Sequence, residues 1–490
     1  MTSSVGGHPG SVWFGVGVDV GTTNTKVVGV RVDPDRFPAG PEVRFTLETP
    51  TPDDAGELDR VVRRLLAEAA ERLPGPAGVI GIASMAETGI PLDAEYAPLT
   101  PLIRWQDVDR TADANALAAT VGADVLIAAT GVRIGPKPPL VMWHWLRRCR
   151  PDLFGRMRHW AGVADWVHHR LTGRLVTDHT LAGRTGAYRL GSADHAPPAG
   201  FDPDLTALAG VRVEQLPRVR AREEPLAGLT DATLVAVGYR SGTPVMVCGH
   251  DHQVAAWAAG VRQPGQTADS VGTAEAVFTL MNHWPDPAAV AAQGMSLVRS
   301  VGGSAALLGG SSAAGGFLQW FADTYAGGDV AACFADVDPE PSTSIVLPYL
   351  TGRQCPSPDP DALPVVIGSP HASAAVHGVA YQAAWMARTQ AELVGVEPDE
   401  LVMIGEPMRR NLGWAAVKAA LAPGPARVVD CEQPVAAGAA VLAGVTAGTI
   451  DPDTTLDTTP AVSHDRRTRQ AHAGGLRRFV EAATSRSNAQ

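Results

Sequence analysis

The stretch VWFGVGVDVGTTNTKVVGVRV, residues 12–32, contains two runs rich in β-branched residues joined by a short Gly/Thr segment. Because β-branched residues favour strands and small residues favour tight turns, this pattern predicts a β-hairpin. At the turn, the backbone of Gly21 and the hydroxyl of Thr22 can donate hydrogen bonds to a phosphate. Lys26 adds a positive charge, and Asp19 offers a carboxylate for a hydrated Mg²⁺. The alternative interpretation is an ordinary polar turn.

Two common nucleotide-binding motifs do not fit this stretch. A P-loop requires GxxxxGK[ST], but none of the three lysines, Lys26, Lys137 and Lys418, follows a glycine. The dinucleotide-binding GxGxxG motif must open a helix, whereas Gly15 and Gly17 lie inside the first predicted strand. The sequence therefore favours a phosphate-binding hairpin of another kind.

The stretch GQTADSVGTAEAVFTL, residues 265–280, repeats the plan of the first one. Asp269 with Gly272-Thr273 echoes Asp19 with Gly21-Thr22, although the spacing differs by one residue. An internal repeat of this kind indicates two related halves. A second phosphate loop in the other half would supply further donors to a polyphosphate.

Predicted helices and strands alternate along the rest of the chain, which is typical of an α/β fold. Apolar runs at 77–84 and 243–249 predict strands. Helical periodicity is found at 57–73, 138–154, 162–173, 315–326, 376–395 and 432–448. We place an N-terminal domain at 11–260, a C-terminal domain at 261–450 and a peripheral tail at 451–490.

The composition describes a globular protein and excludes several classes. The 490 residues predict two or more domains, and 45% hydrophobic with 19% charged residues is not the profile of a disordered chain. A net charge of -11 argues against nucleic acid as a partner. The five cysteines are scattered without a CxxC pair, which indicates a reducing compartment. We find no signal peptide or membrane-length apolar run, so we expect a cytoplasmic protein with no membrane partner.

Two segments carry side chains suited to a polyhydroxylated ligand. MAETGIPLD contains Glu87, and LIRWQDVDR contains Trp105, Gln106, Asp107 and Arg110. Each hydroxyl of a sugar needs a hydrogen-bond partner, and carboxylates and amides beside an aromatic ring provide them. The alternative is a charged surface loop with one core tryptophan.

The segment CGHDHQVAAWAAG allows three interpretations of His250-Asp251-His252. A metal centre would need further ligands, and nothing in the sequence ties His371 or His377 to this segment. A helix N-cap fits Asp251, which precedes a helix-like run. A general base at the carboxyl end of a strand also fits, because α/β proteins place ligands there.

Taken together and in this order, these segments resemble the FGGY carbohydrate kinases of the actin-like ATPase superfamily, from about Val12 to Gly448. DVGTTNTK and SVGTAEAV are similar to the two phosphate segments of that family, and LIRWQDVDR is similar to its W-x-D-x-R substrate loop. MIGEPMRRNLGW resembles the adenosine loop, and EQPVAAGAAVLAG resembles the closing helix. The segment equivalent to CGHDHQVAAWAAG carries the catalytic aspartate, which falls on Asp251.

The resemblance implies an α/β protein with two actin-like (ribonuclease H-like) domains facing each other across a cleft. It implies ATP-dependent phosphorylation of a hydroxyl on a small sugar or polyol, with Mg-ATP clamped between the domains and Asp251 as the general base. A homodimer is compatible with it. The implied metal ligands are Asp19 and Asp251. The implied substrate residues are Glu87, Trp105, Gln106, Asp107, Arg110, His250 and His252. The implied nucleotide residues are Asp19, Gly21, Thr22, Thr23, Asn24, Lys26, Gly272, Thr273, Gly315, Gly405, Glu406 and Asn411.

Three positions depart from the family pattern. Ala86 stands where the glycerol kinase branch has Arg, Arg353-Gln354 stands where Glu-Arg is expected, and Glu406 replaces the second Gly of the adenosine loop. These departures favour an alternative, a catalytically impaired sugar-binding regulatory protein of the same fold. An active enzyme is favoured more strongly by the retained residues, which are Asp19, Lys26, Gly272-Thr273 and Asp251. A chaperone-type ATPase, a third class, would lack the W-x-D-x-R loop.

Overall fold

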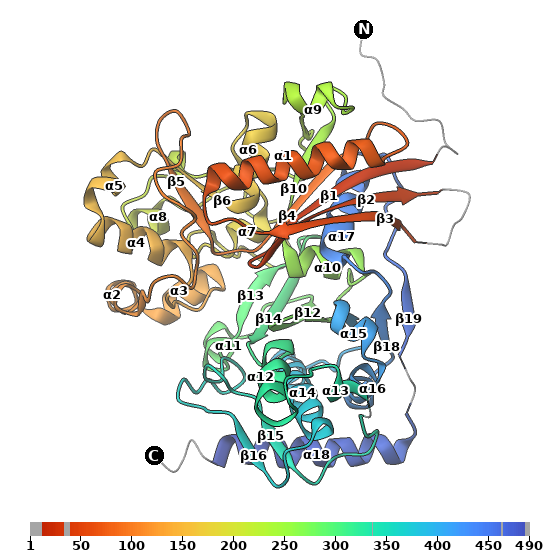
Figure 1. Ribbon diagram of the computed structural model, residues 1–490. Coiled ribbons are helices and arrows are strands. Elements are labelled where there is room, and N and C mark those ends of the chain that lie inside the picture. The colour runs from red at the N-terminus through yellow and green to blue at the C-terminus, as the bar shows by residue number, and fades with distance from the viewer. Residues whose placement is uncertain (1–11, 34–39, 336, 462–463, 486–490) are drawn as a thin grey trace. The chain divides into compact units, whose positions relative to one another are not determined.

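The computed structural model describes residues 12–33, 40–335, 337–461 and 464–485, and the chain divides into two compact units (Figure 1). Unit 1 takes in the chain up to Gly260, Val298–Gly303 and Gln433–Asp457. Unit 2 takes in Val261–Leu297, Ser304–Glu432 and the chain from Thr458. The structure therefore differs from the predicted 261–450 domain, because residues 433–457 pack with the N-terminal sheet.

Unit 1 is built on a six-stranded sheet in the order β3-β2-β1-β4-β10-β9. Strands β1 and β2 pair antiparallel, so the predicted hairpin is confirmed. Strands β1, β4 and β10 run parallel to one another. The bounds are β1 (Trp13–Val20), β2 (Asn24–Val32), β3 (Glu42–Pro50), β4 (Ile80–Ser84), β9 (Ala227–Gly228) and β10 (Pro244–His250).

The other elements of unit 1 cover this sheet or form a helical extension beside it (Figure 1). The predicted helix at 138–154 is two helices, because Pro151 has no N–H to continue the first one. The strands are β5 (Gly89–Leu92), β6 (His159–Gly162), β7 (Val176–Thr177) and β8 (Arg218–Val219). The helices are α1 (Ala55–Arg72), α2 (Thr111–Val121), α3 (Ala123–Thr130), α4 (Pro139–Cys149), α5 (Pro151–Arg156), α6 (Val163–Thr172), α7 (His179–Ala182), α8 (Pro203–Leu208), α9 (Ala232–Ala236), α10 (Asp251–Ala258) and α17 (Pro434–Thr446), with a 3-10 turn at Val213–Gln215.

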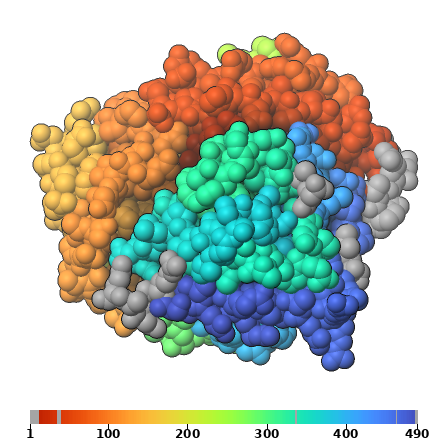
Figure 2. Space-filling view, turned by 60° about the horizontal axis from the view of Figure 1, so that its bottom comes forward, coloured from red at the N-terminus to blue at the C-terminus, as the bar shows by residue number. Residues whose placement is uncertain are grey.

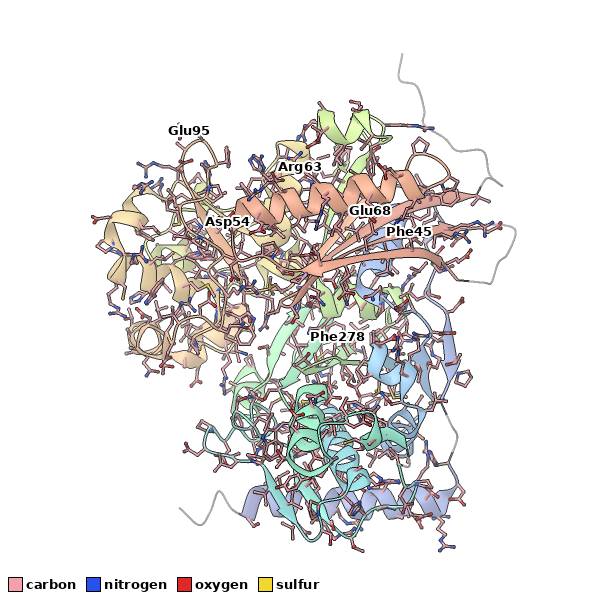
Figure 3. All side chains as sticks on the ribbon, in the orientation of Figure 1. Phe45, Asp54, Arg63, Glu68, Glu95 and Phe278 are labelled. Carbon is pink, nitrogen blue, oxygen red and sulfur yellow. The ribbon has the colours of Figure 1, made fainter. Side chains whose placement is uncertain are left out.

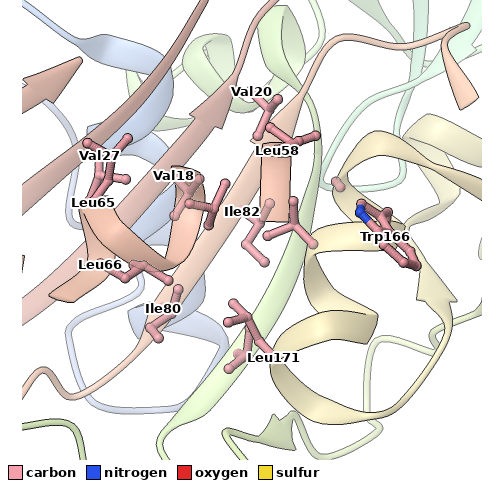
Figure 4. Close-up of a cluster of buried hydrophobic side chains, with 14 of the residues drawn as sticks. Val18, Val20, Val27, Leu58, Leu65, Leu66, Ile80, Ile82, Trp166 and Leu171 are labelled. Atoms are coloured by element: carbon pink, nitrogen blue, oxygen red, sulfur yellow. The ribbon is translucent and has the colours of Figure 1, made fainter. Parts of the chain in front are cut away.

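One face of the sheet packs against α1 and α6. Alternate residues of β1 and β4, among them Val18 and Ile82, pack with Leu58 and Leu66 of α1 and with Trp166 of α6 (Figure 4). The N-terminus of α1 is capped by Asp54, whose carboxylate accepts from the N–H of Glu57 at 2.8 Å (Figure 3). Successive side chains along a strand point to opposite faces of the sheet, so the residues between these ones face the other side of the sheet.

The opposite face packs against α17, and its approach depends on glycine. A Cβ atom at Gly17 of β1 would lie 1.7 Å from the carbonyl oxygen of Ala436, and one at Gly81 of β4 would lie 2.0 Å from that of Ala439. The helix backbone therefore rests directly on the strands. This contact is made by small residues along α17 and, on the strands, by Gly17 and Gly81.

Unit 2 contains a seven-stranded sheet in the order β13-β14-β12-β11-β17-β18-β19. Strand β11 pairs antiparallel with β12 and parallel with β17, as β1 pairs with β2 and β4 in unit 1. The internal repeat seen in the sequence thus corresponds to a repeated sheet topology. The bounds are β11 (Gln266–Val271), β12 (Glu275–Met281), β13 (Ser296–Arg299), β14 (Ala305–Ser311), β17 (Glu400–Ile404), β18 (Ala426–Val429) and β19 (Thr458–Pro460), with a separate pair β15 (Ile345–Leu347) and β16 (Val365–Ile367).

The C-terminal segment is more than a peripheral tail. Helix α18 buries Leu476 and Phe479 against the core of unit 2 and lies along its surface in the space-filling view (Figure 2). The helices of unit 2 are α11 (Pro287–Ala292), α12 (Gly315–Tyr325), α13 (Ala332–Ala335), α14 (Ala372–Val394), α15 (Glu406–Arg410), α16 (Leu412–Leu421) and α18 (Arg466–Ser485). Among the described residues no single helix is long and apolar enough to cross a membrane, although α2 and α3 together, bent by 90°, reach the required length and composition.

The contact between β1 and α17 predicts a strong effect of a single methyl group. Gly17→Ala should destabilise the protein by about 1–3 kcal/mol, because the added Cβ overlaps the Ala436 carbonyl and the helix must move away. Thermal unfolding measures the effect as a lower Tm. Gly75→Ala is the matched control, since a Cβ there meets no atom within 4 Å. Equal Tm values for the two variants would contradict this packing argument.

Candidate active site

Three parallel strands bring the predicted site residues of unit 1 to one edge of its sheet. Val20 of β1 pairs with Ser84 of β4, and Ser84 pairs with His250 of β10. The loop from Gly21, the segment carrying Glu87 and the helix that begins at Asp251 therefore all start at the same edge. In open α/β sheets this carboxyl edge is where ligands bind.

The turn before Asp251 requires glycine. The β10–β4 pairing is irregular between Val247 and Gly249, and Gly249 has a φ of 127°. A Cβ there would lie 2.4 Å from the Oγ1 atom of Thr180 and 2.8 Å from the Oδ1 atom of Asp178. The Thr180 hydroxyl also accepts from the backbone N–H of His250 at 2.9 Å. Helix α7 and its cap thus position the turn that leads into Asp251.

Asp178 itself forms a buried ion pair with His179 at 3.1 Å. Burial acts to raise the pKa of Asp178, but the charge of His179 and hydrogen bonds from Thr180 hold that pKa below its usual range. The same contact raises the pKa of His179 against the effect of its burial. Nothing in the sequence pattern pointed to this pair.

The carboxylate of Asp251 is held by its own neighbours at the start of α10. Its Oδ1 atom accepts from the backbone N–H of His252 at 2.6 Å and faces His250 Nε2 at 3.2 Å and His252 Nε2 at 3.9 Å. Burial lowers the pKa of His250 to about 4, so its ring is neutral at neutral pH. Asp251 begins the helix, while the N-cap position belongs to His250. The ligand atoms of the three residues lie within 4.8 Å of one another, a spacing compatible with a metal ion.

Asp19, the last residue but one of β1, has an unsatisfied carboxylate oxygen. Its Oδ1 atom is buried and has no hydrogen-bond partner among the described residues. Burial and then the charge of Asp251 raise its pKa to about 7, while Lys26, directly opposite on β2, acts to lower it. A buried carboxylate oxygen without a donor fits a divalent cation or its bound water. Asp19 and Asp251 are thus close enough to influence each other.

The first predicted phosphate loop is held by hydrogen bonds to its backbone. The N–H of Gly21 donates to the carbonyl of Asn24 at 3.0 Å, and the hydroxyl of Thr51 donates to the Gly21 carbonyl at 2.8 Å. Thr23 is exposed, whereas Thr22 is half-buried with its hydroxyl 3.5 Å from the sulfur of Met85. The Asn24 amide pairs with Glu48, so that side chain is engaged inside the hairpin.

The W-x-D-x-R loop divides into exposed and buried members. Gln106 and Asp107 are exposed, and the ring of Trp105 lies 4.2 Å from the ammonium of Lys137. Arg110 is fully buried, and its guanidinium donates to the carbonyls of Val108 at 3.2 Å and of its own loop at Arg104 and Trp105. Arg110 therefore uses its donors to hold the loop together, a role the sequence did not suggest.

Arg104 joins the predicted substrate loop to the predicted phosphate loop, a contact that the sequence motif did not indicate. Its Nη1 atom donates to the carbonyl of Thr22 at 2.8 Å, and its Nη2 atom donates to the carbonyl of Thr51 at 3.3 Å. Nη2 also pairs with Asp53 at 2.8 Å. One guanidinium thus links three segments that are distant in sequence.

Glu87 pairs with an arginine from another segment of the chain, Arg184, whereas the neighbouring position holds Ala86. The Glu87 side chain is 12% exposed, and its φ of 63° is an uncommon conformation outside glycine. The Nη2 atom of Arg184 lies 2.5 Å from its Oε1 atom. Burial acts to raise the pKa of Glu87, but Arg184 and Lys137 hold it below its usual range. Arg184, from the segment after α7, was not among the predicted site residues.

In unit 2, the second predicted phosphate loop is exposed at Gly272 and Thr273 and is backed by the start of α12. The N–H of Gly315 donates to the carbonyl of Gly272 at 3.1 Å, and that of Gly316 donates to the carbonyl of Thr273 at 3.0 Å. A Cβ at Gly315 would lie 2.7 Å from the Gly272 oxygen, which explains the glycine there. Gly315 therefore supports this loop from behind.

Asp269 does not match Asp19 in its environment. Its carboxylate pairs with the buried ammonium of Lys418 at 2.5 Å, and Lys418 also pairs with Glu275. Burial raises the pKa of Glu275 well above its usual range. The triad connects both strands of the second hairpin to α16, and Asp269 and Lys418 also line a cavity of about 400 Å³ beside α14. The charge of Asp269 is therefore neutralised inside unit 2.

The predicted adenosine loop begins at Gly405, which has a φ of 115° and would place a Cβ 2.1 Å from the carbonyl oxygen of Val271. The carboxylate of Glu406 is held by Arg409 at 2.9 Å and by Arg410. The amide of Asn411 donates to the Pro407 carbonyl at 2.8 Å. Both polar side chains are thus engaged in local contacts.

The Arg353-Gln354 departure has a local structural role. Arg353 is buried, lies over the rings of Tyr349 and Trp385, and donates to the carbonyl of Ala483 at 2.9 Å. Gln354 accepts from the N–H of Ser312 at 3.2 Å. Arg353 therefore connects α18 to the rest of unit 2.

Comparison with known proteins identifies the class. The model of the N-terminal domain of the FGGY family of carbohydrate kinases matches residues 14–258, and that of its C-terminal domain matches residues 268–447. The chain therefore belongs to the FGGY family of carbohydrate kinases, as its sequence resemblance predicted.

Individual relatives differ in the sugar that their names give. A gluconokinase from Bacillus subtilis (strain 168) is 23% identical over 366 residues, which cover 71% of this chain and 69% of the relative. An L-fuculokinase from Escherichia coli (strain K12) is 27% identical over 184 residues, only 38% of either protein. The chain thus spans well under two thirds of that second relative.

Solved structures confirm the predicted fold class. A gluconate kinase from Lactobacillus acidophilus superposes with a TM-score of 0.83 at 20% identity over 97% of this chain and 98% of the other. A xylulose kinase from the same organism gives a TM-score of 0.84 at 20% identity over 96% and 98%. The two α/β units are accordingly of the actin-like type.

The unsatisfied carboxylate of Asp19 predicts a pH-dependent stability difference. Asp19→Asn should have a higher Tm than the wild-type protein in EDTA. This difference in Tm should widen from pH 4 to pH 7 and stay constant above pH 7. The folded-state pKa of about 7 exceeds the usual 3.8, so the folded protein binds the proton more tightly than the unfolded chain and loses stability as pH rises between these values. We expect a gain of at least about 2 °C at pH 8, measured by thermal unfolding.

Addition of Mg²⁺ should narrow that gap at pH 8 by stabilising the wild-type protein, and it should leave the Asp19→Asn variant unchanged. A gap that does not vary with pH would contradict the assignment of the raised pKa to Asp19.

The position of Arg104 predicts coupled effects on two substrates. Arg104→Met should raise the KM for ATP and the KM for the sugar together, because the loops that carry Thr22 and Trp105 lose their common anchor. Leaving the Thr51 carbonyl without a donor should also cost about 1–3 kcal/mol of stability. Steady-state kinetics measures both KM values. Arg44→Met, at an exposed arginine that pairs with Glu42, is the control, and a change in one KM alone would refute the anchoring role.

Proposed function

We propose that this kinase transfers the γ-phosphoryl group of ATP to a hydroxyl of a small sugar, sugar acid or polyol, with Asp251 as the general base. The observation that carries the proposal is the common edge of β1, β4 and β10. Asp19 is the last residue but one of β1, Glu87 lies between β4 and β5, and Asp251 begins α10. A phosphate loop, a polar residue for the acceptor and a carboxylate base in one place are the parts that phosphoryl transfer needs.

Asp251 would accept the proton of the attacking hydroxyl. Its Oδ1 atom is engaged by the backbone N–H of His252, so Oδ2 is the oxygen left to take the proton. Neutral His250, 3.2 Å from Oδ1, helps to orient the carboxylate without neutralising it. General-base catalysis of this kind contributes about 10²–10⁴-fold to the rate.

Mg²⁺ would be held by the carboxylates of Asp19 and Asp251, and when bound it would neutralise charge on the phosphates. The buried Oδ1 atom of Asp19 supports this assignment. Gly21, Thr22, Thr23 and Lys26 would bind phosphate oxygens through N–H, hydroxyl and ammonium groups. The binding of Mg-ATP by both domains, and the roles of Gly272, Thr273, Gly405, Glu406 and Asn411 in it, remain predictions from the family resemblance.

The relatives do not select one acceptor. The names gluconokinase, L-fuculokinase and xylulose kinase cover a sugar acid and neutral sugars. Glu87, Trp105, Gln106 and Asp107 would contact the acceptor in any of these cases. The contact between Arg184 and Glu87 supports an active site over the regulatory alternative, because it restores a cation beside Glu87 despite Ala86.

Replacement of Asp251 tests the proposal. Asp251→Asn should lower kcat by at least about 10²-fold while the affinity for ADP, measured by calorimetry without Mg²⁺, stays the same. The control is Asp204→Asn on the exposed surface of α8. ADP release is followed over a panel of sugars, sugar acids and polyols. Near-normal turnover by Asp251→Asn would disprove its role, and sugar binding without any turnover by the wild type would favour the regulatory alternative.

A further inference from the structure

The guanidinium of Arg184 has donors that the protein does not use. Its Nη2 atom pairs with Glu87, but its Nε and Nη1 atoms are buried and have no hydrogen-bond partner among the described residues. Only 13% of the side chain is exposed. A buried guanidinium with unpaired N–H groups is costly, so a ligand with matching acceptors is expected beside it.

The charges around Glu87 do not balance. The Lys137 ammonium lies within electrostatic range of Glu87 and Arg184, so two cations, Arg184 and Lys137, act on one carboxylate. Glu87 is already paired with Arg184, and Lys137 contacts the ring of Trp105 but no carboxylate among the described residues. The Lys137 side chain is exposed, so its ammonium is accessible to a ligand. One further negative charge would balance this group.

The other acidic residues of the site are committed elsewhere. The Asp107 carboxylate accepts from the backbone N–H of Arg104 at 2.9 Å, and Asp251 is held by His252. Asp19 lies on β1, where its charge is felt by Asp251 and Lys26. A negatively charged group on the ligand would pair with the free donors of Arg184 and with Lys137.

We propose that the acceptor is a sugar acid, whose carboxylate is bound by Arg184 and Lys137 on the predicted substrate side of the site, beside Glu87 and Trp105. This deepens the proposed function and rests on it. Arginine pairs with carboxylates through parallel N–H bonds, and two cations discriminate strongly against an uncharged group at the same place. Neutral ketoses and polyols would leave Nε and Nη1 of Arg184 unpaired and would be poor substrates.

The carboxylate takes no part in the transfer itself. A hydroxyl elsewhere on the carbon chain forms the new O–P bond, the bond between the γ-phosphorus and the β,γ-bridging oxygen breaks, and ADP leaves. The hydroxyl proton passes to Asp251. Binding of the acid end would thus orient the reacting hydroxyl, which is how binding energy remote from the reacting atoms increases turnover.

The test compares acceptors that differ only in the charged group. D-Gluconate is paired with D-glucitol, and D-xylonate with xylitol, with D-xylulose as a neutral ketose. The complete protein is assayed for ADP release with Mg-ATP. For at least one pair we expect kcat/KM for the acid to exceed that for its neutral partner by about 100-fold or more.

Two substitutions locate the effect. Arg184→Gln should lower kcat/KM for the acid by about 100-fold or more, mainly through KM, and bring the acid-to-neutral ratio towards one. Lys137→Met should shift the ratio in the same direction by about 10-fold, and Arg184→Lys should restore part of it. Arg189→Gln is the matched control, since Arg189 is half-exposed and pairs with Asp202. If Arg184→Gln does not fold, the acid-to-neutral ratios of kcat/KM for Lys137→Met and Arg184→Lys still test whether these two cations bind the carboxylate.

The outcomes separate this proposal from the one on which it rests. Phosphorylation of neutral sugars with equal or lower activity on their acids would overturn the sugar-acid proposal and leave the kinase assignment intact. An acid-to-neutral ratio that Arg184→Gln and Lys137→Met leave unchanged would also overturn it. Failure of the wild type to phosphorylate any member of the panel would count against the proposed function and the sugar-acid proposal together.

Discussion

The site of unit 1 depends on a close contact between helix α17 and strands β1 and β4. Gly17 and Gly81 have no side chains on that face, so the carbonyls of Ala436 and Ala439 approach to distances that a methyl group would prevent. The other face carries Val18 and Ile82 against α1 and α6. With both faces covered, the central parallel strands form a rigid base, and their carboxyl ends are held in register for ligand binding.

At this edge of the sheet, several charged side chains form hydrogen bonds with backbone carbonyls and so hold the loops of the site in place. Arg104 binds the carbonyls of Thr22 and Thr51, and Arg110 binds the carbonyls of its own loop. Asp178 and Thr180 support the turn at Gly249 that presents Asp251. The side chains that remain for ligands are few, and they include an unsatisfied Asp19 carboxylate and a partly unsatisfied Arg184 guanidinium.

Much of the fold and several segments of the candidate site could be predicted, because the sequence patterns that specify them are local. The hairpin at residues 12–32, the loop at Gly272-Thr273 and the helix starting at Asp251 each depend on a short run of residues. Arg104, Arg184 and Lys418 could not be predicted in this way, because each acts through a partner between 82 and 149 residues away. Arg110 was expected to contact substrate, whereas its guanidinium donates to loop carbonyls; a motif gives the residue type but not the direction of the side chain.

The sequence by itself determined the first hairpin, several other strands and helices, the two glycine–threonine loops and the family, since alternation, helical periodicity and motif order are properties of the chain. Tertiary structure alone decided that α17 joins the N-terminal sheet, that Asp269 is neutralised by Lys418 while Asp19 has no such partner, and that Arg184 supplies the cation beside Glu87. The physical reason is that burial and charge pairing depend on distance in space, and residues far apart in sequence become neighbours only when the chain has folded.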